Sequence, residues 1–76
     1  MNKLRRKQLA AIIEKLEELT ANLETLKEEE EDYRDNIPEN LWGSERYEKA
    51  DTACDNLDYA VSSLEEALSY IEEATE

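Results

Sequence analysis

The sequence predicts an all-α fold: an antiparallel two-helix hairpin of the coiled-coil type that dimerises into a four-helix bundle. Three observations predict it: two heptad stripes of apolar residues, one break that holds the only Pro and the only Gly, and a basic cluster placed to meet acidic residues. We expect a single domain over residues 1–76, with helices at 3–34 and 45–75 and a turn at 35–44.

The first helix is predicted from an apolar residue at every third or fourth position. Such spacing places these side chains along one edge of a helix, at the a and d positions of a heptad. The a positions hold Leu9, Leu16 and Leu23, and the d positions hold Ile12, Leu19, Leu26 and Tyr33. Ile13 widens the stripe at position e. We therefore expect the a and d side chains of this helix to face the second helix.

The second helix carries a more complete stripe, in which every a and d position is apolar or aromatic. The a positions hold Tyr47, Cys54, Val61 and Leu68, and the d positions hold Ala50, Leu57, Leu64 and Ile71. Small residues recur beside them at g, namely Ala53, Ala60, Ala67 and Ala74. Because small side chains allow close approach of two backbones, we interpret this flank as a packing surface.

The segment 35–44 interrupts both stripes. Pro38 is unfavourable inside a helix and disfavours helical geometry at Ile37, although it suits the start of a short helical turn over 38–41. Gly43 and Ser44 indicate a stop followed by an N-cap, and Glu45 adds favourable charge to the next first turn. A connection of this length between two helices of similar length predicts an antiparallel pair.

Charge favours the same pairing. Four basic residues in the first turns of the first helix oppose its dipole, but in an antiparallel hairpin they lie beside the C-terminus of the second helix. The basic residues are Lys3, Arg5, Arg6 and Lys7, and the carboxylates expected near them are Glu65, Glu66, Glu72, Glu73 and Glu76. Contact of the basic cluster with phosphate is the alternative interpretation.

Tyr59 and Tyr70 fall outside the predicted seam, at positions f and c. They are either solvated tyrosines or, together with Ile13, a second face on which two hairpins form a homodimer.

The composition excludes several classes of function. The net charge of −12 argues against direct binding of nucleic acid or of an anionic membrane. The chain has no histidine and one cysteine, so it lacks an imidazole base and the usual ligands of a metal centre, and we expect neither catalysis nor a cofactor. No apolar run approaches the ~20 residues of a membrane span, and we expect a cytoplasmic protein. Cys54 lies on the predicted seam and is interpreted as a small buried hydrophobe, with a reactive thiol as the alternative.

The densest acidic run is the sequence EEEED at 28–32. On a helix its members point around the axis, which is typical of a solvated face. As a unit, Glu28, Glu29, Glu31 and Asp32 are also candidates for binding a basic protein surface, including a nucleic-acid-binding enzyme of a host cell that they engage by mimicking DNA.

The turn also holds three apolar residues that a minimal connection does not need: Ile37, Leu41 and Trp42. One interpretation is a hydrophobic plug over the open end of the hairpin, near Tyr33 and Tyr47. The other is a recognition tip, with Leu41 and Trp42 as anchors of a protein interface.

The run DNIPENLWGSERY at Asp35–Tyr47, followed by a helix that ends in LEEALSYIEEA, resembles small acidic helical proteins encoded in phages and prophages of Firmicutes. The likeness covers most of the chain, and its specific part is the turn. It implies a phage or mobile-element setting but no functional residue. We therefore expect a non-enzymatic protein-binding or inhibitor protein; the alternative is a structural or assembly module that only oligomerises.

Overall fold

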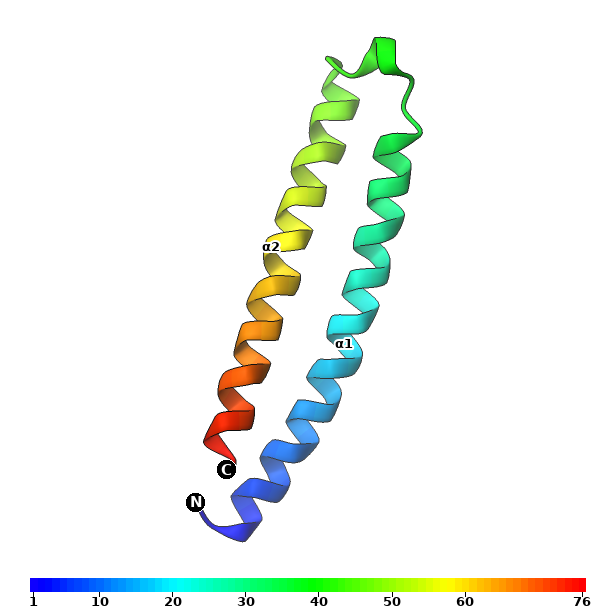
Figure 1. The fold of residues 1–76 in the computed structure, drawn as a ribbon. Coiled ribbons are helices and arrows are strands. Elements are labelled where there is room, and N and C mark those ends of the chain that lie inside the picture. The colour runs from blue at the N-terminus through cyan, green and yellow to red at the C-terminus, as the bar shows by residue number, and fades with distance from the viewer.

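The computed structural model describes residues 1–76 as a hairpin of two long helices joined by a short turn. Helix α1 spans Lys3–Asp35, a 3₁₀ turn η1 spans Glu39–Leu41, and helix α2 spans Glu45–Ala74. The helices run antiparallel, so that both termini lie at one end and the turn at the other (Figure 1). The rod measures 59 × 15 × 13 Å. The predicted all-α helical hairpin is therefore confirmed.

A side-chain cap begins each long helix. The Asn2 Oδ1 atom accepts a hydrogen bond of 2.7 Å from the backbone N–H of Arg5, and the Ser44 Oγ atom accepts one of 3.3 Å from that of Tyr47. Both satisfy an amide that lacks a partner within the helix. The sequence predicts the cap at Ser44, whereas the cap at Asn2 is an additional finding.

On α2 the buried edge follows the predicted stripe. The buried residues of this helix are the d residue Ala50 and the a residues Cys54, Val61 and Leu68. The remaining d residues, Leu57, Leu64 and Ile71, are half-buried. The small side chains at its turn-proximal end leave room for long side chains from α1.

On α1 the buried edge differs from the prediction. The expected d residues Ile12, Leu19, Leu26 and Tyr33 are between 44% and 59% exposed. The less exposed side chains lie mainly at positions a and e instead: Leu9, Ile13, Leu16, Thr20, Leu23, Lys27, Glu30 and Arg34, with Glu31 at b. The prediction that the d side chains of α1 face α2 is therefore wrong. We call these four exposed residues the d stripe.

Two ion pairs cross the seam from the e edge of α1. The Nζ atom of Lys27 lies 3.2 Å from Asp58, and a guanidinium nitrogen of Arg34 lies 3.1 Å from Asp51. Both cations occupy position e, on the edge of α1 that lies against α2. Their aliphatic stems fill the space that small residues such as Cys54 leave open.

The basic cluster at the start of α1 lies at the same end as the last turns of α2 (Figure 1). None of its four cations is within 4.0 Å of a carboxylate, since the ion pairs of the chain involve only Lys27, Arg34 and Lys49. The basic cluster therefore lies at the same end as the carboxylates of α2 but forms no ion pair with them.

Ile13, Tyr59 and Tyr70, the residues of the alternative dimer face, differ in exposure within the hairpin. Ile13 is half-buried on the e edge of α1, whereas both tyrosines are largely exposed on α2, outside its buried edge. Eleven positions separate the two tyrosines, or about 16 Å along the helix. Ile13 thus lies on the packed edge of the hairpin, whereas the two tyrosines lie on its solvent side.

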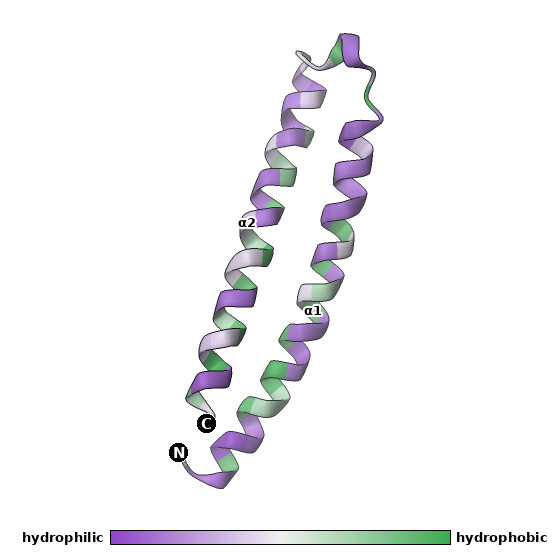
Figure 2. Cartoon of the chain, in the orientation of Figure 1, coloured by the Kyte–Doolittle hydropathy of each residue, from purple (hydrophilic) through white to green (hydrophobic).

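Hydrophobic segments alternate with hydrophilic ones along both helices (Figure 2). Neither helix contains an apolar stretch long enough to cross a lipid bilayer.

Thr20 provides a test of the seam. It is 6% exposed, and its Oγ1 atom has no hydrogen-bond partner. A buried polar group without a partner is unfavourable, so Thr20→Val is expected to raise the free energy of unfolding by about 1 kcal/mol. Urea denaturation followed by circular dichroism at one protein concentration measures it. The matched control is Thr25→Val, because Thr25 is exposed and donates to the Ala21 carbonyl. A loss of stability in Thr20→Val contradicts this seam.

Candidate functional site

Only one of the apolar side chains in the turn, that of Ile37, is buried. Ile37 is 3% exposed, and its N–H donates a hydrogen bond of 3.1 Å to the Arg34 carbonyl. Leu41 and Trp42 are 44% and 46% exposed. Of the three apolar residues expected to act as a plug, only Ile37 is buried.

Trp42 is held against the turn along part of its indole. Its Nε1–H donates a hydrogen bond of 3.1 Å to the Ile37 carbonyl. Its ring stacks on Tyr47, with 5.6 Å between ring centroids and 25° between ring planes. The side chain therefore fastens the turn to the first residues of α2 and also presents a free edge beside Leu41. The interpretations of Trp42 as a cap and as an exposed residue each describe part of it.

Tyr33 and Arg46 connect the two helices next to the turn. The Arg46 Nε–H donates a hydrogen bond of 2.8 Å to the Tyr33 hydroxyl, and the guanidinium carbon lies 5.2 Å from the centroid of the same ring. Arg46 was not among the expected site residues. The only sequence signal for it is its place in the first turn of α2, opposite the last turns of α1.

The acidic run 28–32 lies on the last two turns of α1. Glu28, Glu29 and Asp32 are exposed, and Glu31 is half-buried. None of them pairs with a cation of the chain. Because consecutive helical residues point in different directions, the run does not converge on one point. No group of three or more His, Cys, Asp or Glu residues is arranged to hold a metal ion.

The two cations at the seam are structural. The hydrogen bond to Asp58 raises the pKa of Lys27, and the hydrogen bond to Asp35 raises the pKa of Arg34. Both side chains therefore stay charged throughout the physiological pH range and do not exchange protons with a ligand.

Cys54 lies in the turn-proximal half of the seam and is buried. Burial raises the pKa of its thiol, and the charge of Arg34 opposes that effect only in part. At neutral pH the sulfur is therefore protonated and is a poor nucleophile.

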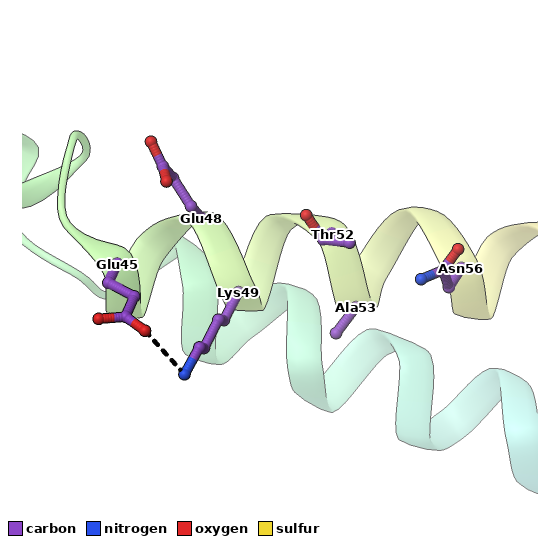
Figure 3. Close-up of a pocket in the computed structure, with 6 residues that line it drawn as sticks. All are labelled: Glu45, Glu48, Lys49, Thr52, Ala53 and Asn56. Carbon is purple, nitrogen blue, oxygen red and sulfur yellow. Dashed lines mark ion pairs between the residues drawn. The ribbon is translucent and has the colours of Figure 1, made fainter.

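A shallow groove lies along the outer side of α2, close to the turn. Its volume is about 410 Å³, and the Glu45–Lys49 ion pair of 3.0 Å occupies one end (Figure 3). The side chain of Glu48 points away from this pair (Figure 3). The residues that line the groove are Glu45, Glu48, Lys49, Thr52, Ala53 and Asn56. The groove contains no nucleophile beside a base. Because all of its lining residues belong to α2, it does not enclose a substrate.

No protein family, curated protein or solved structure matches this chain. What the hairpin does is therefore inferred from its own side chains. Exposed groups without a partner in the chain include the outer carboxylates of 28–32, the free edge of Trp42, and Ile12, Leu19 and Leu26 of the d stripe.

The thiol of Cys54 is expected to react slowly in the folded protein, because the sulfur is covered and protonated. Reaction with an aromatic disulfide reagent should be roughly tenfold or more slower in buffer than in concentrated urea at the same pH. Absorbance of the released thiolate measures the rate, and Cys54→Ala supplies the background. Equal rates in the two conditions contradict burial of the thiol.

Removal of the Trp42 indole is expected to weaken the turn. Trp42→Ala loses the stacking on Tyr47 and the hydrogen bond to Ile37, which together contribute about 2 kcal/mol. Thermal and urea unfolding followed by circular dichroism measure the change. Leu41→Ala is the matched control, with an expected change within about 0.5 kcal/mol. An equal effect of the two substitutions shows that the indole does not fasten the turn.

Proposed function

We propose that this chain is a non-enzymatic protein-binding protein that engages a basic surface through the carboxylates near its turn. One observation carries the proposal: the negative charge is concentrated at that end. Residues 28–52 hold ten carboxylates and three cations, a net charge of −7. The opposite end, residues 1–8 and 64–76, holds five carboxylates and four cations, a net charge of −1.

The availability of these carboxylates supports the proposal. Of the 21 acidic residues, only Asp35, Glu45, Asp51 and Asp58 lie within 4.0 Å of a cation in the chain. The remaining carboxylates repel one another along a rod 59 Å long. A basic partner relieves this repulsion, and its approach is accelerated by the field of the rod.

A nucleic-acid-binding protein is a suitable partner class, because its basic cleft is built for a line of negative charges. A DNA duplex of the same 59 Å length carries about 35 phosphates, against 21 carboxylates here. The hairpin is therefore a less dense imitation of DNA. The resemblance of its turn to phage and prophage proteins suits an inhibitor of a host enzyme.

Apolar groups beside the acidic region supply anchors for such an interface. Leu41 and the free edge of Trp42 lie at the tip, next to the carboxylates at the end of α1. Tyr59 and Tyr70 offer two further exposed rings on α2. Aromatic anchors often dominate binding energy, whereas surrounding charges govern the rate of encounter.

A second candidate function is an assembly module that only oligomerises. The exposed d stripe on α1 favours it, because apolar side chains repeated along a whole helix are typical of a self-association surface.

The test of the proposed function is affinity capture from a bacterial lysate with two charge variants. One variant neutralises Glu28, Glu29 and Glu31 to Gln and Asp32 to Asn. The control neutralises Glu65, Glu66, Glu72 and Glu73 to Gln, so both variants lose four negative charges. We expect wild type and control to retain a partner that the first variant loses. Rising salt should also release it, since screening weakens exposed charge contacts.

Three results contradict or redirect the proposal. Equal retention by the two variants, or retention in high salt, shows that the acidic run does not bind the partner. Failure of duplex DNA to compete excludes the imitation of DNA. Self-association without any captured partner favours the assembly module.

A further inference from the structure

The d stripe is one part of a longer apolar face. In an antiparallel pair the d positions of both helices lie on the same side of the seam, and the e positions lie on the other. Since α1 turns its e edge toward α2, its d stripe lies beside the half-buried Leu57, Leu64 and Ile71 of α2. Apart from Arg46, which lies over the Tyr33 ring, nothing in the chain covers this side of the hairpin.

The exposed area of the hairpin is large for its mass. The chain exposes 5844 Å², whereas a compact monomer of 8.9 kDa exposes about 4,800 Å². The excess of about 1,000 Å² is close to the ~800 Å² that each partner buries in a standard protein interface. No large side chain is fully buried within the hairpin. The area therefore suits a partner that covers one whole side of the rod.

We propose that this face binds a second copy of the chain, with the two turns at opposite ends of a four-helix bundle. The interface consists of the d stripe and the d residues of α2 from both copies. This inference does not depend on the proposed function, because Glu28, Glu31 and Asp32 lie off the shared face and only Glu29 of the acidic run borders it.

Charge selects the orientation. Two hairpins joined with their turns together bring two ends of charge −7 side by side, which is strongly unfavourable. With the turns at opposite ends, each of these ends lies beside the terminal end of the other copy. The terminal end carries a charge of only −1 and the unpaired cations Lys3, Arg5, Arg6 and Lys7.

The pattern along α1 sets the alignment. Asn22 lies near the middle of the d stripe, and Lys15 and Glu29 lie seven residues on either side of it. In an antiparallel contact of α1 with its copy, centred between Asn22 and Leu23, Lys15 of each copy comes within one residue of the position opposite Glu29 of the other. The same alignment places Leu19 opposite Leu26 and Ile12 opposite Tyr33. Neither Lys15 nor Glu29 has an ion pair within the hairpin.

Measurement of mass in solution tests the association. Light scattering at physiological ionic strength should give twice the 8.9 kDa of one chain. The double variant Leu19→Glu, Leu26→Glu should give the mass of one chain and stay helical, because both residues are exposed in the hairpin. The control Tyr59→Glu, Tyr70→Glu should remain a dimer. A monomeric wild type, or a dimer that survives charges at both stripe positions, overturns the proposal.

Cross-linking tests the orientation. In a Cys54→Ala background, Asn22→Cys should give a covalent dimer with a short bifunctional maleimide, because the twofold axis passes close to residue 22. Ala21→Cys is the matched control, since it is adjacent in sequence but lies on the side of α1 away from this face. Cross-linking of Asn22→Cys no greater than that of Ala21→Cys overturns the orientation, because with the turns together residue 22 faces α2 of the second copy.

Discussion

Two helices that pack as a pair share a single line of contact, and each helix hides only one edge along it. This constraint determines most of what is seen in the hairpin. Helix α1 has apolar or aliphatic groups at positions a, d and e, but it cannot place all three against α2. The e edge, with the ion pairs of Lys27 and Arg34, lies against α2, and the d stripe is left in solvent. The low burial of the chain follows directly from the number of its helices.

The seam is divided into two halves with different chemistry. From Leu9 to Leu23, the side chains that α1 turns toward α2 are aliphatic, with Thr20 among them. The facing side chains of α2 are mainly leucine and valine. From Lys27 to Arg34, long cationic side chains cover the small residues of α2 and bond to its carboxylates. The aliphatic half holds the helices together through burial, while the ionic half adds the contacts of Lys27 with Asp58 and of Arg34 with Asp51. Most of the unpaired carboxylates of α1 lie between Leu23 and the turn, beyond the aliphatic half.

Sequence reasoning predicts the architecture well and the contacts less well. The breaks at Pro38 and Gly43, the cap at Ser44 and the stripe of α2 are local signals, and each corresponds to a feature of the structure. The edge of α1 is different, because the leucines at d predict a seam that the residues at e then occupy. That outcome depends on Asp51 and Asp58, which lie far from α1 in sequence. For the candidate site, the sequence indicates the acidic run and the aromatic tip, but not Arg46 or the bond from Trp42 to Ile37, which depend on the path of the turn.

The place of Trp42 has a spectroscopic consequence. It is the only tryptophan of the chain, and its ring lies at the one point where α1 must reverse direction into α2. Helices of 33 and 30 residues are long enough to gain helical structure before they meet. Far-ultraviolet circular dichroism reports the formation of the helices, whereas the fluorescence of this indole reports closure of the turn. The molecule thus carries its own optical probe for comparing formation of the helices with closure of the turn, at a position where no label has to be introduced.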